Sequence, residues 1–328
     1  MSAMLSMCFA VIAWSLYPLA AVMSLKTMTG LELVLVTTFF SAIGITIIAL
    51  VRFIRRNKLA EIIQKHKELE KSTYITILIS GITNVVCHAC FFAALSMSHK
   101  GGVSLLYESW PIIAVIATPF LIKKAWKEVS FKEFMVSLIA LVGMGIIILS
   151  NEDIDLPFFN SKDLNHERDY VALLGYVLAF IGAYSCAMCV VLKGLVAEHY
   201  GGAANGVGTT IISEFYSRVI SVIIMLVVFF VMKDQINLVN IDWFWSLFIS
   251  ICVMVMGGIL YTYALINTDR PTIHILYYLV PFFAVFSLWM AGETTTNTGL
   301  FVGGAIIIAC NIYLYYAGRR ADFVAPPL

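Results

Sequence analysis

The sequence predicts an all-α polytopic membrane protein with ten transmembrane helices, arranged as two inverted five-helix repeats. Three observations predict this fold: the composition, the length of the apolar segments, and a short pattern that occurs once in each half. The 328 residues are 61% hydrophobic and only 12% charged, whereas soluble domains are about 45–50% apolar and about 25% charged. So few charges cannot cover a solvated surface, which excludes a soluble globular enzyme, a disordered chain and a coiled coil. The formal net charge of +1 leaves no overall field that would attract nucleic acid.

Ten apolar segments each come close to the roughly 20 residues that a helix needs to cross a bilayer. They are residues 4–25, 31–54, 74–97, 103–122, 131–149, 171–192, 207–231, 243–267, 272–290 and 299–317. The segments lack the strict apolar–polar alternation of barrel strands, so we predict helices. All seven cysteines lie inside them, where we expect small buried hydrophobic side chains rather than disulfides or metal ligands.

Basic residues collect on one side of the predicted membrane. With a cytoplasmic N-terminus, the inside segments hold fifteen Lys and Arg and the outside segments hold five. The fifteen are Arg52, Arg55, Arg56, Lys58, Lys65, Lys67, Lys71, Lys123, Lys124, Lys127, Lys132, Lys193, Arg270, Arg319 and Arg320. By the positive-inside rule, both termini are expected to be cytoplasmic, in a cytoplasmic (inner) membrane. The inside segment 55–72 has apolar residues at helical spacing, which fits either an amphipathic helix on the membrane surface or a solvated helix.

The two halves of the chain share a spacing pattern. Ala94 precedes Pro111 by 17 residues, and Ala264 precedes Pro281 by the same interval. Repeats of five spans each must insert in opposite directions, which is an architecture of transporters whose substrate site lies between the halves. We therefore predict a first repeat at 1–150, an acidic extracytoplasmic linker at 151–170, a second repeat at 171–318 and a cytoplasmic tail at 319–328.

Several short motifs resemble the drug/metabolite transporter superfamily, EamA type. The motifs are Ala13–Ser15, Trp110–Pro111, Tyr261–Leu265, Pro281–Val285 and Gly292–Glu293, and the resemblance covers most of residues 4–317. Two stretches, Tyr107–Pro111 and Leu178–Ala183, look closest to the aromatic amino-acid exporter branch. The resemblance implies ten spans in two inverted repeats and transport of small metabolites.

Ionisable residues inside the predicted spans are candidate functional groups, because each costs at least ~2.5–3.5 kcal/mol at the bilayer centre. Glu108 could bind an ammonium group or carry a proton, or it could reach interfacial water. His88 could bind a carboxylate or relay a proton, or it could be satisfied by Asn84 or a backbone carbonyl. Glu214 and Arg218, one turn apart, could bind a zwitterion or form a structural ion pair. They belong to a polar stripe that also contains Thr210, Ser217 and Ser221.

Aromatic side chains near helix-breaking prolines are the expected lining of a cavity, although plain packing is an equal alternative. The predicted substrate-binding set is His88, Glu108, Trp110, Tyr107, Trp14, Tyr17, Glu214, Arg218, Tyr261 and Tyr278, with helix breaks at Pro18, Pro111 and Pro281. His274 is expected to lie in an interfacial first turn. Glu108 and His88 are the candidates for proton coupling.

These residues predict a secondary transporter that exports small amphipathic metabolites, most of all amino acids with aromatic or hydrophobic side chains. The alternatives are a transporter of lipophilic or quaternary cations, a nucleotide-sugar exchanger, and a membrane enzyme or scaffold. No phosphate-binding loop or catalytic motif occurs in the chain, so neither ATP hydrolysis nor enzyme activity is expected. We expect no cofactor or nucleic acid, and a monomer or homodimer in the bilayer.

Overall fold

The computed structural model describes residues 3–55, 59–110, 113–114, 135–136, 139–140, 142–143, 146, 166–200, 207–266, 276, 279–295 and 298–322. Every regular element in these ranges is helical. The elements are α1 (Ala3–Ser15), α2 (Tyr17–Ser24), α3 (Gly30–Arg55), α4 (Leu59–Lys67), α5 (Lys71–Met97), α6 (Lys100–Tyr107), α9 (His166–His199), α10 (Val207–Met232), η3 (Lys233–Gln235), η4 (Leu238–Asn240), α11 (Trp243–Leu247), η5 (Phe248–Gly257), α12 (Gly258–Ile266), α14 (Val280–Met290) and α15 (Thr298–Asp322).

Six helical segments in the described ranges are long and apolar enough to cross a membrane. They coincide with the first, second, third, sixth, seventh and eighth predicted spans, and two shorter apolar helices lie in the ninth and tenth. The fifth predicted span and the acidic linker lie largely outside the described residues, as do parts of the fourth. The count of ten spans and the inverted repeat therefore stay predictions.

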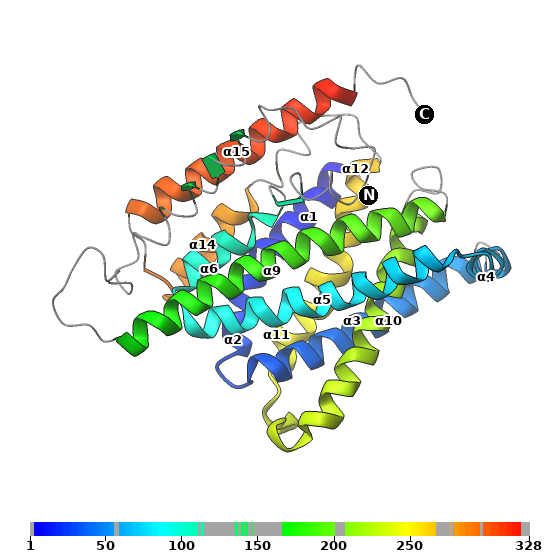
Figure 1. The fold of residues 1–328 in the computed structure, drawn as a ribbon, viewed down its shortest axis with the longest axis horizontal. Coiled ribbons are helices and arrows are strands. Elements are labelled where there is room, and N and C mark those ends of the chain that lie inside the picture. Colours follow the sequence, from blue (N-terminus) through cyan, green and yellow to red (C-terminus); the bar gives the residue numbers. More distant parts are fainter. Residues whose placement is uncertain are drawn as a thin grey trace.

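Four helices pack together in the middle of the molecule. The two long helices α5 and α9 lie along each other (Figure 1), while α3 and α10 pack against α5 and α10 also contacts α9. Small and hydroxyl residues let α10 approach α5 closely: Ser217 Oγ donates to the Ser80 carbonyl at 3.2 Å, and Ser221 Oγ donates to the Gly81 carbonyl at 3.1 Å. This is the packing expected where lipid supplies no hydrophobic force between helices.

One predicted proline break, at Pro18, interrupts a segment that would otherwise be a continuous helix. Leu16 separates α1 from α2, and Pro18 stands in the first turn of α2. Pro281 stands in the first turn of α14, after a turn at Leu279. Proline fits a first helical turn, where its missing N–H has no partner to lose. Helix α6 ends at Tyr107 as predicted, but Pro111 itself lies outside the described residues.

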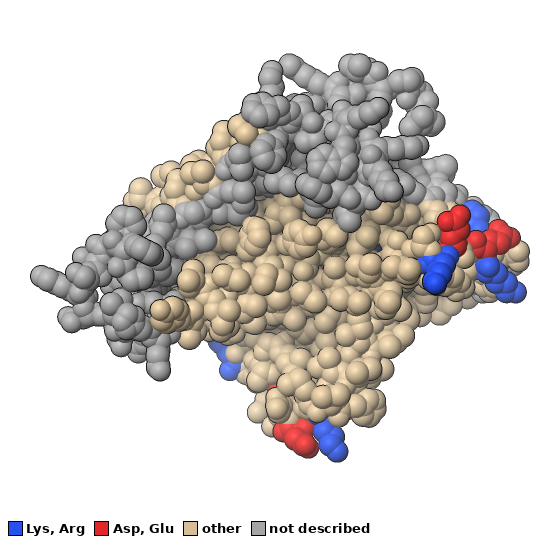
Figure 2. Space-filling view, viewed as in Figure 1, with Lys and Arg blue, Asp and Glu red and all other residues tan. Residues whose placement is uncertain are grey.

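The exposed charged residues on the face shown in Figure 2 lie near the ends of helices. In Figure 2 the Lys, Arg, Asp and Glu side chains gather around α4 and at the tip after α10, with an uncharged surface between them. Exposed apolar side chains such as Phe230 (71%) and Val231 (79%) belong to this uncharged surface. The 55–72 segment does contain a helix, α4, and His66 Nδ1 of this helix shares a 2.8 Å hydrogen bond with the Tyr216 hydroxyl of α10.

Candidate functional site

A cavity of about 310 Å³ lies at the middle of the helix bundle. Its walls come from α1, α2, α5, the end of α6 and the residues just after it, α9, α10, η5 and α12. It extends from mid-helix toward the end of the molecule where α9 ends and α10 begins, because Lys193, Ala197 and Thr210 line it. Its position among eight helical elements from both halves of the sequence makes it the candidate binding site.

Nine of the ten predicted substrate-binding residues line this cavity. They are Trp14, Tyr17, His88, Tyr107, Glu108, Trp110, Glu214, Arg218 and Tyr261. The tenth, Tyr278, lies outside the described residues, as does His274.

Glu108 presents a carboxyl group at the end of α6. The residue caps the C-terminus of that helix, and only 6% of it is exposed. In the described part of the chain, its carboxyl group has no hydrogen-bond or ion-pair partner. A buried, unpartnered carboxyl group on a cavity wall is available to a ligand that carries a hydrogen-bond donor or a positive charge.

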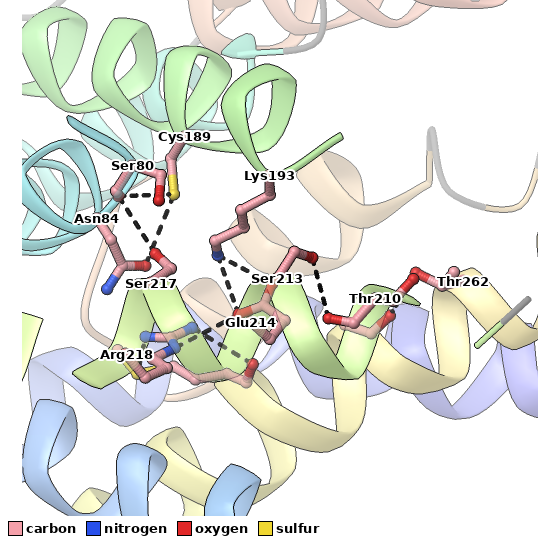
Figure 3. A network of polar contacts seen from close by, with 12 residues as sticks. Ser80, Asn84, Cys189, Lys193, Thr210, Ser213, Glu214, Ser217, Arg218 and Thr262 are labelled. Atoms are coloured by element: carbon pink, nitrogen blue, oxygen red, sulfur yellow. Dashed lines mark hydrogen bonds and ion pairs between the residues drawn. The ribbon is translucent and has the colours of Figure 1, made fainter. Parts of the chain in front are cut away.

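Glu214 joins two basic residues of the cavity wall, and Figure 3 shows the three side chains converging between α9 and α10. Lys193 Nζ lies 2.9 and 3.0 Å from the two Glu214 oxygens. Arg218 Nε lies 3.5 Å from Glu214 Oε2. We call Lys193, Glu214 and Arg218 the charge triad; with two cations and one anion, it carries a surplus positive charge.

The Arg218 guanidinium group is incompletely hydrogen-bonded. Its Nε donates no hydrogen bond among the described residues. Nη1 contacts the Met254 sulfur at 3.5 Å and Nη2 donates to the Met254 carbonyl at 3.4 Å. Sulfur is a weak acceptor, and a guanidinium group has five donors in a fork that matches a carboxylate. Arg218 can therefore still donate hydrogen bonds to an anionic group.

Lys193 corrects the interpretation of the sequence. The basic-residue count places it in a cytoplasmic segment beyond a span ending at 192, but α9 continues to His199 and Lys193 lies inside the span Tyr170–Ala197. Its side chain is only 13% exposed. Its position next to the apolar run made it resemble a boundary residue. Only the approach of α10, which brings Glu214 next to Lys193, distinguishes a buried, ion-paired lysine from a lysine at the membrane boundary.

The polar stripe on α10 divides between two roles. Glu214, Arg218 and Thr210 face the cavity, whereas Ser217 and Ser221 bond to α5. Asn84 of α5 also turns to α10, where its Nδ2 donates to Ser221 Oγ at 3.0 Å. Asn84 is thus not the partner of His88: that partner is Tyr17, whose hydroxyl lies 2.8 Å from His88 Nδ1.

Aromatic rings form much of the remaining wall. Trp14 lies 5.1 Å from Tyr261 between ring centroids, and its indole Nε1 donates to the Val253 carbonyl at 3.2 Å. That carbonyl belongs to η5, a π-helix, a rare conformation that is frequent at functional sites. A Cβ on Gly257 would lie 2.7 Å from Trp14 Nε1. Glycine at the end of η5 is therefore required for the indole to occupy this part of the wall.

Cysteines also face the cavity, but they form no evident metal centre. Cys87, Cys186 and Cys189 are lining residues. The thiol of Cys87 bonds to the Asn84 carbonyl at 3.2 Å and that of Cys189 to the Ser80 carbonyl at 3.5 Å. In the searched, described portion of the chain, there is no group of three His, Cys, Asp or Glu side chains placed to bind a metal ion.

A cluster of polar residues ties helix ends together away from the cavity. Glu293, just beyond α14, pairs with Lys26 after α2 and with Lys100 at the start of α6, at 2.5 Å each. Hydrogen bonds from Lys100 and Lys26 hold the pKa of Glu293 below its usual range. Gly292, at φ 71°, turns the chain so that the Glu293 N–H reaches the Leu288 carbonyl at 2.9 Å. We call Lys26, Lys100 and Glu293 the ion-pair clamp.

Comparison with known protein families finds a match in the first part of the chain. Residues 1–149 match the EamA-like transporter family. This EamA-like part contains α1 to α6, and with them Trp14, Tyr17, His88 and Glu108 of the cavity. The family match and the apolar helices together identify a multi-pass membrane protein, and the EamA-like half suggests a membrane transporter.

A solved structure shares the overall fold. It is described as "Crystal structure of protein", with a TM-score of 0.55 and 17% sequence identity over 97% of this chain and 98% of that chain. At this identity the likeness concerns the fold alone. No curated protein matches the sequence.

Proposed function

We propose that the protein is a secondary transporter that exports small amphipathic metabolites, in particular amino acids with aromatic or hydrophobic side chains, by alternating access. The observation that carries the proposal is the chemistry of the cavity. It combines the buried Glu108 carboxyl group, which has no hydrogen-bond partner among the described residues, the incompletely bonded Arg218 guanidinium group and several aromatic rings.

A zwitterion satisfies both polar groups at once. Its carboxylate can pair with the Arg218 fork, which neutralises the surplus charge of the triad. Its ammonium group can pair with Glu108 and contact the neighbouring aromatic faces. An apolar or aromatic side chain then packs against rings such as Trp14 and Tyr261, which lie together on the wall.

Alternating access is supported by the difference between the two ends of the molecule. The cavity runs toward the end where α9 is followed by α10. The ion-pair clamp joins the ends of α2 and α14 to the start of α6, and its residues do not line the cavity. Breaking the clamp and closing the cavity's other end would exchange the side from which substrate enters. Two half-bundles that rock about a central site are the general form of this mechanism.

Glu108 and His88 are the groups we propose for proton coupling. A carboxyl group without a fixed partner can bind or release a proton as substrate enters and leaves. The His88 ring lies on the same cavity and its Nδ1 is 2.8 Å from the Tyr17 hydroxyl, so a proton can pass along that hydrogen bond.

The test is transport by purified protein in liposomes loaded with labelled phenylalanine, leucine or lysine. We expect efflux of the aromatic or aliphatic amino acid, and a large loss of rate in Glu108→Gln and in Arg218→Lys, which keeps the charge but loses the guanidinium fork. Glu68→Gln, an exposed residue on the surface near α4, is the matched control and should transport normally. Wild-type rates in both cavity variants would refute the binding site.

Transport of a lipophilic cation is the alternative that Glu108 and the aromatic rings also favour. Such a cation has no carboxylate, and it would meet the surplus positive charge of the triad. A cation substrate predicts that Arg218→Lys keeps its rate while Glu108→Gln loses it. An amino-acid substrate predicts that both variants lose it.

A further inference from the structure

A second hollow lies on the outside of the bundle, between α3, α10 and α12. It has a volume of about 580 Å³, and its wall is formed by Ile47, Ile48, Val51, Arg52, Arg55, Val207, Ile211, Ile259, Leu260 and Tyr263. We call it the lateral groove. It shares no described lining residue with the central cavity, so the transport proposal does not account for it.

The lateral groove has an apolar body and a basic end. Ile47 and Val51 stand 55% and 46% exposed on the outer face of α3, where a membrane protein meets acyl chains. Both charged residues among the described lining residues are arginines, Arg52 and Arg55, which form the basic part of the last turn of α3.

The start of α10 adds to the positive potential at this end. A Cβ on Gly208 would lie 3.8 Å from Arg52 Nε, which places that guanidinium group beside the first turn of α10. The first turn contains no acidic residue. An α-helix N-terminus carries a partial positive charge and N–H groups without helical partners. The arginines, together with this helix end, favour a phosphate group.

We propose that the lateral groove binds an anionic phospholipid from the membrane leaflet at which α3 ends. The phosphate pairs with Arg52 and Arg55, and an acyl chain lies along Ile47, Val51 and Ile211. The charge and the layout of the groove both match such a lipid. The arginines stand at the helix end, where headgroups lie, and the apolar wall continues toward the membrane interior. A soluble anion would gain nothing from that wall.

The test is native mass spectrometry of the full-length protein in mild detergent, with phosphatidylglycerol or phosphatidylcholine of the same acyl chains added. We expect wild-type protein to bind a first phosphatidylglycerol more tightly than phosphatidylcholine. Arg52→Gln/Arg55→Gln should weaken phosphatidylglycerol binding about thirty-fold, at roughly fivefold for each arginine near a membrane surface. Lys67→Gln/Lys71→Gln removes the same charge from exposed lysines of α4 and α5 outside the groove and should change binding little.

A second variant tests the apolar part without changing charge. Val51→Trp fills the groove, whereas Val231→Trp adds the same bulk at an exposed site at the far end of α10. We expect the first to weaken lipid binding and the second to leave it unchanged.

Four results would overturn the proposal. Equal loss in the Lys67/Lys71 control would indicate attraction by the whole basic surface. Equal affinity for both lipids would remove the role of the arginines. Displacement of the lipid by glycerol 3-phosphate alone would indicate a headgroup site without an acyl groove. Unchanged binding in both Arg52→Gln/Arg55→Gln and Val51→Trp would place the lipid elsewhere.

Discussion

Replacing Glu214 by glutamine removes the single acidic member of the charge triad. Lys193 and Arg218 would then lie in the bundle with no carboxylate between them, and the net charge of the triad would rise from one to two. The three side chains are 13%, 16% and 5% exposed for Lys193, Glu214 and Arg218. Water therefore does little to compensate the change.

The distances within the charge triad set the size of the expected loss of stability. At separations of 2.9 Å from Lys193 and 3.5 Å from Arg218, and with an effective dielectric constant of about 20, each pair gains roughly 5 kcal/mol of Coulomb attraction before desolvation is counted. Breaking a buried pair by removing one partner costs about 3–5 kcal/mol in total, because charge is left uncompensated. At about 2 °C for each kcal/mol, Glu214→Gln should lower the melting temperature by roughly 6–10 °C.

Lys193→Met is the informative comparison. It leaves Glu214 paired with Arg218 and the triad neutral, so it should cost less than Glu214→Gln. In the double variant the two changes should be less than additive, because removing Lys193 also removes one of the uncompensated cations.

The assay is thermal unfolding of the purified variants in one detergent, followed by tryptophan fluorescence, at several salt concentrations. Buried pairs are screened weakly, so the ranking should persist at high salt. Melting of Glu214→Gln at the wild-type temperature would contradict this expectation, and so would a double variant whose melting temperature falls by the sum of the two single changes or more.

Three other predictions follow from the packing. Gly257→Ala places a methyl group against the Trp14 indole; the overpacking should cost roughly 1–3 kcal/mol and reduce transport, and unchanged transport would show that the indole is free to move. Ser221→Ala removes the Asn84 hydrogen bond and should destabilise the protein by about 0.6–1.7 kcal/mol in an unfolding titration, with no effect if the two helices are held by apolar packing alone. The lowered pKa of Glu293 means that the ion-pair clamp stabilises the protein above the ordinary glutamate pKa of about 4.3. That stability is lost as the pH falls through the lowered value, so melting temperatures measured below pH 5 should fall more steeply in wild type than in Glu293→Gln; parallel curves would exclude the linkage.

Much of the helical architecture could be predicted because it depends on local composition. Long apolar runs must form helices in lipid, since each backbone N–H and C=O must be satisfied within the segment. The break at Pro18 was predictable for the same local reason. The π-helical stretch Phe248–Gly257 was not, because its sequence is apolar except for Ser250 and nothing in it distinguishes one helical hydrogen-bond pattern from another.

The candidate site was predictable to the extent that buried polar residues are costly. Glu108, Glu214 and Arg218 were identified because an ionisable group in an apolar run needs a protein partner. Lys193 was missed because it stands at the end of its run, where water is an equally good partner. The roles of these residues in binding stay predictions until transport is measured.

The sequence by itself determined that the chain is a helical membrane protein, which segments are apolar enough to span, and which few polar side chains stand inside them. Only the tertiary structure decided how those side chains are shared between packing and the cavity. Ser221 faces α5 while Glu214, two turns away on α10, faces Lys193. The physical reason is that hydrophobicity and proline act within one segment, whereas such pairings depend on how each helix is rotated against its neighbours.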